Sequence, residues 1–241
     1  MNRNILELAG VHTHIGAYHI LHGVNLQVPV GELTMLLGRN GAGKTTALRT
    51  IMGLWHASRG QIRFDGQDIS AMETPHIARL DIAYVPENMG IFADLSVKEN
   101  MLLAARSASH AKHMDEDRLN WIFSLFPAVQ KFWNHPAGKL SGGQKQMLAV
   151  ARAIVEPRKL LIVDEPSKGL APAIINNMID AFGQLKQTGT TILLVEQNIS
   201  FAKRLGDHVA VMDNGRVVHA GPMQELTDDE AMQHNLLGLA I

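Results

Sequence analysis

The chain has 241 residues, of which 46% are hydrophobic, so it can form one α/β domain or a core carrying a smaller lobe. Lysine and arginine number 22 against 23 aspartate and glutamate, a formal net charge of −1 that argues against a broad basic surface for nonspecific nucleic-acid binding. Cysteine is absent, which excludes disulfides and thiolate metal sites. The first residues lack a signal-peptide pattern, and no apolar run approaches the roughly 18 residues of a spanning helix.

The N-terminal part of the chain predicts strands around one loop. Residues 5–11 and 20–28 alternate apolar and polar side chains, as in a half-exposed antiparallel sheet. A buried strand at 33–37 enters the loop GRNGAGKTT, and a helix from Lys44 to about Met52 ends at Gly53. Further strands are expected around Ile62 and Phe64 and at 82–85.

From about residue 87 to 135 the pattern changes to helical periodicity, with helices expected at 97–105 and 118–126. We interpret this part as a helical lobe inserted into a core formed by about 1–86 and 136–241. The remaining core elements are expected as a helix after Ser141, a strand at 159–164, a helix at 173–186, a strand at 190–195, a short helix near 200–205, a hairpin turning on Asn214 and Gly215, and a C-terminal helix from Pro222 to about Leu237.

The loop GRNGAGKTT fits the phosphate-binding pattern G-x-x-x-x-G-K-[ST] and lies between a predicted strand and a predicted helix. Its glycines allow backbone N–H groups to point into one concavity at the positive end of the helix. Lys44 is expected to reach the β- and γ-phosphates, and the Thr45 hydroxyl to bind Mg²⁺. The nucleotide-binding residues expected here are Gly38, Arg39, Asn40, Gly41, Ala42, Gly43, Lys44, Thr45 and Thr46.

A second motif, KLLIVDEP, places two acids at the end of a predicted buried strand. Hydrolysis of a bound nucleotide needs a carboxylate for the metal and a group that activates water. Asp164 is expected to hold Mg²⁺, directly or through water, and Glu165 to activate the attacking water. Taken alone, acids at a strand end often mark only the start of a loop. The two acids indicate a hydrolytic site only in combination with the phosphate-binding loop.

A third motif, LSGGQ, precedes a long helical run. Ser141 is a natural N-cap, and Gly142 and Gly143 leave the helix start open to a phosphate; the alternative is a capped helix without a ligand. Together with the other two motifs, in this order and spacing, LSGGQ resembles the signature of ATP-binding cassette (ABC) ATPases over nearly the whole chain. The resemblance implies a P-loop α/β core with an antiparallel β subdomain and an inserted α-helical subdomain. It also implies a composite site, in which residues Ser141 to Gln144 contact ATP held by a partner cassette.

Three further motifs resemble the ATP-binding subunits of bacterial importers for branched-chain amino acids and related substrates, including urea and amides. They are VPE ending at Glu87, DEPSKGLAP starting at Asp164, and VEQN ending at Asn198. This resemblance implies ATP and Mg²⁺ as ligands, a second cassette, membrane permeases that dock on the helical lobe, and indirectly a solute-binding protein. It also implies a place at the cytoplasmic face of the inner membrane and no nucleic-acid partner.

The chain departs from the wider ABC pattern at several positions. Glu87 stands where many cassettes have Gln and could approach Mg²⁺ or its water, and Gln197 stands where many have His. Gln197 can hydrogen-bond a γ-phosphate but cannot carry a positive charge, which suggests slower hydrolysis and unequal sites in the assembly. The usual adenine-stacking aromatic falls at Ile15, with Tyr18 as a substitute.

Several alternatives stay open at this point. A soluble cassette acting on DNA or the ribosome would usually carry a long coiled-coil insertion or a second cassette, and neither pattern is present. A second alternative is a subunit that responds to ATP but hydrolyses it weakly. Gln197 favours this alternative because it cannot carry a positive charge, and Glu165 opposes it because it can activate water. His12, His14, His19 and His22 suggest either a metal site or ordinary exposed histidines.

Overall fold

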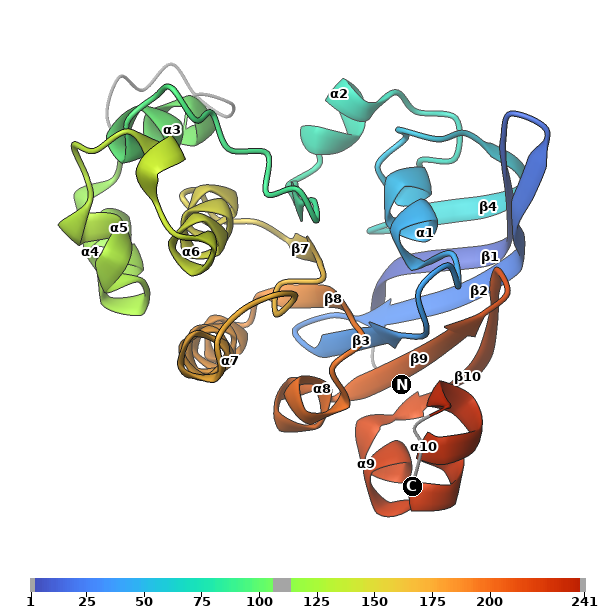
Figure 1. Cartoon of the computed structure of the whole chain (residues 1–241). Coiled ribbons are helices and arrows are strands. Elements are labelled where there is room, and N and C mark those ends of the chain that lie inside the picture. Colours follow the sequence, from blue (N-terminus) through green and yellow to red (C-terminus); the bar gives the residue numbers. More distant parts are fainter. Residues whose placement is uncertain (1–2, 106–113, 239–241) are drawn as a thin grey trace.

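The computed structural model describes residues 3–105 and 114–238, and its strands form two sheets (Figure 1). The first sheet is antiparallel and has the order β2-β1-β4-β5; its strands are β1 (Asn4–Ile15), β2 (Tyr18–Pro29), β4 (Ala57–Phe64) and β5 (Gln67–Asp68). The second sheet has the order β10-β9-β3-β8-β7-β6. Its strands are β3 (Leu33–Leu37), β6 (Ile82–Val85), β7 (Leu160–Asp164), β8 (Thr191–Glu196), β9 (His208–Asp213) and β10 (Arg216–Pro222).

The second sheet brings the predicted motifs to one edge. Five of its strands run parallel, and only the edge strand β10 is antiparallel to its neighbour. Leu37 at the end of β3 lies opposite Glu196 of β8, and Asp164 at the end of β7 lies opposite Val195. Since the carboxyl ends of parallel strands meet at the same edge, the loops after β3, β7 and β8 are neighbours in space, where open α/β sheets bind their ligands.

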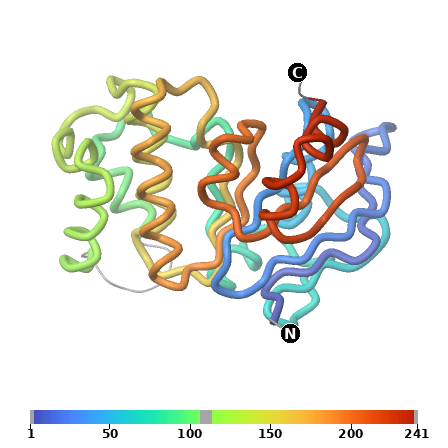
Figure 2. Tube along the Cα trace, turned by 90° about the horizontal axis from the view of Figure 1, so that it is seen from below, coloured from blue at the N-terminus to red at the C-terminus, as the bar shows by residue number. Residues whose placement is uncertain are grey.

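Helices lie on both sides of the second sheet and at one end of the molecule. In Figures 1 and 2, α3, α4 and α5 gather at the end away from the antiparallel sheet, where α3 and α5 contact α6. Within the described ranges, no helix has the length and apolarity needed to cross a membrane. The helices are α1 (Lys44–Ile51), α2 (Thr74–Ala78), α3 (Val97–Ala105), α4 (Glu116–Leu125), α5 (Pro127–Lys131), the 3₁₀ helix η1 (Ala137–Lys139), α6 (Gly142–Ala153), α7 (Pro172–Gln187), α8 (Ile199–Leu205), α9 (Met223–Asp228) and α10 (Glu230–Leu237).

Alternation of side chains along the buried strands divides the core into two clusters. On β7, Leu161 and Val163 face a cluster shared with α6, α7 and α8, whereas Leu160 and Ile162 face a cluster shared with α1 and the antiparallel sheet. The parallel strands are apolar at nearly every position because both of their faces are covered. The sheet therefore has a rigid, buried middle that fixes the loops at its carboxyl edge.

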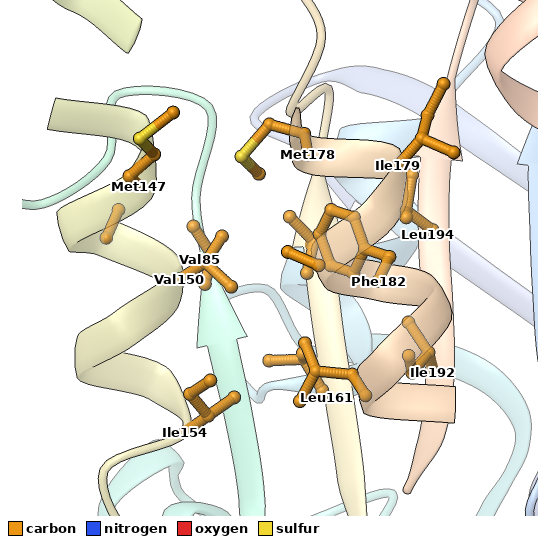
Figure 3. Packing of buried hydrophobic residues seen from close by; sticks show 14 of the residues in the cluster. Val85, Met147, Val150, Ile154, Leu161, Met178, Ile179, Phe182, Ile192 and Leu194 are labelled. Atoms are coloured by element: carbon orange, nitrogen blue, oxygen red, sulfur yellow. The ribbon is translucent and has the colours of Figure 1, made fainter. Parts of the chain in front are cut away.

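The Phe182→Ala substitution is expected to lower the free energy of unfolding by about 3–5 kcal/mol. Phe182 is fully buried on α7, faces the sheet beside Leu161 and Leu194 (Figure 3), and packs edge-on against Phe201 with ring centroids 6.3 Å apart. Urea denaturation measures the change. Val218→Ala on β10, where the side chain is 50% exposed, is the control and should change stability by less than about 0.5 kcal/mol; equal losses for the two variants would contradict this packing.

Most turns and helices predicted from the sequence agree with the structure, but the predicted C-terminal helix does not. Asn214 and Gly215 form the two-residue turn between β9 and β10, with φ of 44° and 74°. The single helix expected from Pro222 to Leu237 is wrong, because the chain forms α9 and α10 with a break at Asp229. Asp229 has extended backbone angles, and its side chain accepts a hydrogen bond from the Met232 N–H at 2.8 Å, so it caps a new helix and ends the first.

Candidate active site

The loop between β3 and α1 adopts a conformation that its glycines make accessible. Gly41 and Gly43 have φ of 80° and 102°, in the left-handed region where side chains are disfavoured, and Gly43 is the N-cap of α1. A Cβ at Gly38 would collide with the backbone oxygen of Met212 on β9. The loop can therefore lie close to the sheet edge while its N–H groups and the start of α1 stay directed at one concavity.

Lys44 folds back over this loop. Its Nζ donates to the carbonyl oxygens of Gly38 at 2.7 Å and Arg39 at 3.0 Å, and lies 3.7 Å from Oε1 of Glu165. Burial lowers the pKa of Lys44, and the charge of Glu165 opposes this shift. A bound phosphate can replace the two neutral carbonyl partners with charged oxygens, so the side chain is placed to hold a nucleotide.

Asp164 is a buried acid whose carboxylate lacks the hydrogen bonds that would offset its burial. Neither of its carboxylate oxygens has a hydrogen bond of regular geometry among the described residues, although the Thr45 hydroxyl is near enough to lower the pKa. Burial dominates and raises the pKa of Asp164 to about 6. Oxygen ligands of this kind suit Mg²⁺, which binds through one or two protein groups and keeps several waters. Asp164 and Thr45 therefore fit the ion that the sequence implies.

The Asp164→Asn substitution is expected to stabilise the Mg²⁺-free protein at neutral pH by about 1–3 kcal/mol, because it removes a buried, unpaired charge. Since the folded-state pKa is raised, Asp164 contributes stability that is present below its ordinary value of 3.8 and lost as the pH rises through about 6. The variant should lack the fall in stability between pH 3.8 and about 6, because Asn does not ionise. It should also lose the strengthening of nucleotide binding by Mg²⁺. Thermal melts without Mg²⁺ and nucleotide titrations with it measure both effects. Asp94→Asn, an exposed acid, is the control; destabilisation by Asp164→Asn would contradict the assignment.

Glu165 lies in the first turn beyond β7, where its φ of 49° is unusual for a residue with a side chain. Its N–H donates to the carbonyl of Val195 at 3.0 Å, so β8 holds this turn in place. Oε1 accepts a hydrogen bond from Nε2 of Gln197, which also donates to Oδ1 of Asn40 at 2.8 Å. The loops after β3, β7 and β8 are thus joined around one carboxylate.

Two residues of this network were not found from the sequence. Lys168 lies 2.5 Å from Oε1 of Glu87 and 3.3 Å from Oε2 of Glu165, and hydrogen bonding to these acids raises the pKa of Lys168. Glu196 is buried and accepts from the N–H groups of Ser167, Gln197 and Asn198, and its burial raises its pKa. Glu196 ties the loop after β7 to the loop after β8. The signal for Lys168 was its position in DEPSKGLAP, three residues after Glu165.

A pocket of about 370 Å³ is lined by eight of the predicted nucleotide-binding and catalytic residues. Tyr18 is 77% exposed at the tip of the hairpin between β1 and β2 and does not line this pocket, where Ile20 lies instead. Arg39 turns its side chain away and donates to the carbonyl of Leu237 at the end of α10. The residues lining the pocket are Ile20, Asn40, Gly41, Gly43, Lys44, Thr45, Thr46, Glu87, Glu165 and Lys168.

The signature residues lie outside this pocket. Ser141 caps α6 in a reciprocal pair with Gln144: the Gln144 N–H donates to Oγ of Ser141 at 3.3 Å, and the Ser141 N–H donates to Oε1 of Gln144 at 2.9 Å. Gly142 has open space around it, whereas a Cβ at Gly143 would lie 2.8 Å from Ile174 of α7. Gly143 is therefore needed for the packing of α6 on α7, a reason that the sequence did not reveal.

The four N-terminal histidines form a stack on the hairpin of β1 and β2. The ring of His19 lies 4.2 Å from that of His14 and 4.0 Å from that of His22, and Nε2 of His19 is 3.0 Å from Nδ1 of His12. Partial burial and the neighbouring charges of His19 and Arg216 lower the pKa values of His12 and His22. In the described part of the chain, no three or more His, Cys, Asp or Glu side chains are placed so that they could hold a metal ion.

Comparison with known proteins identifies the family of the chain. A family model described as "ABC transporter" matches residues 21–168. The chain is 38% identical over 214 residues to the high-affinity branched-chain amino acid transport ATP-binding protein BraG of Pseudomonas aeruginosa, covering 89% of this chain and 91% of that protein. It is 35% identical over 222 residues to the probable branched-chain amino acid transport ATP-binding protein LivF of Archaeoglobus fulgidus, covering 92% and 93%.

A solved structure shows the same fold. The structure of cbiO1 from Clostridium perfringens, described as part of the ABC transporter complex cbiONQ, superposes with a TM-score of 0.82 at 26% identity and covers 100% of this chain and 96% of that one. The expected α/β fold of an ABC ATPase cassette with an antiparallel β subdomain is confirmed. The chain belongs to the ABC transporter family and is an ABC-type ATPase.

Proposed function

We propose that this ATPase binds and hydrolyses ATP to drive solute import through a bacterial membrane complex. The observation that carries the proposal is the meeting of Lys44, Asp164 and Glu165 at one sheet edge, together with the names of two relatives, both of which are branched-chain amino acid transport ATP-binding proteins. Those names favour branched-chain amino acids as the solute. A related amino acid, amide or small organic acid is the alternative.

Residues in and beside the pocket have different roles in the chemistry. Lys44 and the N–H groups from Gly41 to Thr46 bind the phosphates of ATP, and Thr45 and Asp164 hold Mg²⁺. When bound, Mg²⁺ neutralises charge on the phosphate oxygens during transfer. Glu165 accepts the proton of the attacking water, and Gln197 orients this carboxylate through its hydrogen bond.

The position of the signature supports a composite site with a second cassette, identical or different. Ser141 and Gly142 are exposed at the start of α6 and do not line the pocket of their own chain. A helix start with free N–H groups attracts a phosphate, so these residues are available to ATP bound by the partner. ATP then favours the closed dimer, because only in that state does ATP contact both the phosphate-binding loop of one cassette and the signature residues of the other. Hydrolysis removes this preference.

We further propose that the lobe at about 87–135 docks on permease subunits at the cytoplasmic face of the membrane, with a solute-binding protein as an indirect partner. Glu87 lies where the core passes into this lobe and also lines the pocket, which supports a coupling role. A nucleic-acid partner is not part of the proposal, because the net charge is −1.

Affinity purification of tagged Glu165→Gln protein from native membranes with ATP and Mg²⁺ tests the transport role. We expect two permeases and a second cassette in the eluate, identified by mass spectrometry. Tagged Lys44→Ala protein is the matched control, since it should not be held in the ATP-closed state. Recovery of soluble proteins or nucleic acid alone would overturn transport and leave the ATPase chemistry in place. Uptake of labelled leucine, glutamate and urea by the reconstituted complex would then distinguish the solutes.

A further inference from the structure

Lys168 lies between the two acids that line the pocket. Its Nζ is 2.5 Å from Oε1 of Glu87 and 3.3 Å from Oε2 of Glu165. The Glu165 side chain is 8% exposed, whereas those of Lys168 and Glu87 are 55% and 45% exposed. Lys168 therefore connects a buried carboxylate to one at the surface.

The two oxygens of Glu165 have different partners. Oε1 accepts from Gln197 and lies 3.7 Å from Nζ of Lys44. Oε2 is buried and has no hydrogen bond of regular geometry among the described residues, and the cation facing it is Lys168. Orientation of the carboxylate thus depends on Lys168 at one oxygen and on Gln197 at the other.

The backbone around Lys168 is held to the turn after β7 and to Glu196 at the end of β8. The Lys168 N–H donates to the carbonyl of Glu165 at 3.2 Å, and the neighbouring Ser167 N–H donates to buried Glu196 at 2.9 Å. Glu87 follows the end of β6 and leads into the segment that reaches α3. Glu87 and Glu165 both attract the ammonium group of Lys168. A shift of that segment changes the distance from Glu87 to Lys168, and therefore changes how strongly Lys168 interacts with Glu165.

We propose that Lys168 is a positioning residue that holds Oε2 of Glu165 and makes its orientation depend on Glu87. The inference rests on the proposed function, since it assumes that Glu165 activates water. It assigns Lys168 no phosphate contact, because Lys44 already occupies the loop that binds phosphate.

Steady-state hydrolysis and equilibrium MgATP binding by the full chain, alone or with the second cassette recovered with it, test the proposal. Lys168→Met is expected to lower kcat about 5- to 20-fold, because the contacts to Glu165 and Glu87 are lost. It should change MgATP affinity less than about threefold, because the proposal gives Lys168 no contact to a phosphate. Lys168→Arg should keep kcat within about threefold of the unaltered protein, since it restores a cation at this point. Lys98→Met, at an exposed lysine on α3, is the control.

A double-mutant cycle tests the link to Glu87. Glu87→Gln should change kcat in the presence of Lys168 and have at least threefold less effect in Lys168→Met protein. Additive effects would overturn the link, unchanged kcat in Lys168→Met would overturn the positioning role, and an equal loss of affinity and turnover would assign Lys168 to phosphate binding instead. Absence of hydrolysis by the unaltered protein would overturn the proposed function, and this inference with it.

Discussion

Glu165→Gln is expected to reduce ATP turnover by about 100-fold or more while MgATP affinity stays within about threefold of the unaltered protein. The amide has nearly the same shape as the carboxylate and can still accept the hydrogen bond from Gln197, but it cannot take a proton from water. Loss of a general base typically costs about 10²- to 10⁴-fold in rate. Phosphate release under saturating ATP measures turnover, and a fluorescent nucleotide titration measures affinity.

The control for this experiment is Glu73→Gln, at an exposed acid that precedes α2 and makes no side-chain cap. It should hydrolyse ATP at the normal rate. Normal turnover by Glu165→Gln would remove Glu165 from the catalytic role, and a large loss of affinity would show instead that its charge serves mainly to hold the loop through Lys44.

Lys44→Ala is expected to weaken nucleotide binding by roughly 30-fold or more, because removing one member of a buried charged contact costs about 2–5 kcal/mol. Lys44 is 4% exposed, and its Nζ is the donor to the Gly38 and Arg39 carbonyls. Without it, the negative charges of Asp164 and Glu165 face the incoming phosphates with less compensation. Nucleotide titration measures the loss directly.

Thermal melts of the nucleotide-free Lys44→Ala protein show whether the loop still folds. Lys98→Met provides a lysine substitution away from the pocket and should bind ATP normally. Tight ATP binding by a folded Lys44→Ala protein would contradict the phosphate role of this lysine. Weak binding together with a normal melt would separate loss of a ligand contact from loss of structure.

Features with a local cause were predictable from the sequence. The strand before Gly38, the turn at Asn214 and Gly215, and the cap at Ser141 each depend on φ preferences or hydrogen bonds within a few residues. The strands β7 and β8 were predictable because burial on both faces requires continuous apolar runs. Their carboxyl ends then mark where ligand-binding loops must lie.

Contacts between distant parts of the chain were decided by the tertiary structure. The hydrogen bonds of Gln197 to Glu165 and Asn40 join three loops, and no spacing rule in the sequence relates these residues. Tyr18 lies at an exposed hairpin tip because the pairing of β1 with β2 extends to that end. Its contact with the base of the nucleotide stays a prediction.

The sequence by itself determined the fold class and the chemical groups of the site, since motifs and apolar periodicity are local properties. Only the tertiary structure decided that Lys168 meets both Glu87 and Glu165, and that Gly143 is required by Ile174. The physical reason is that strand order and helix packing set these distances, and both depend on the burial of the whole core rather than on neighbouring residues.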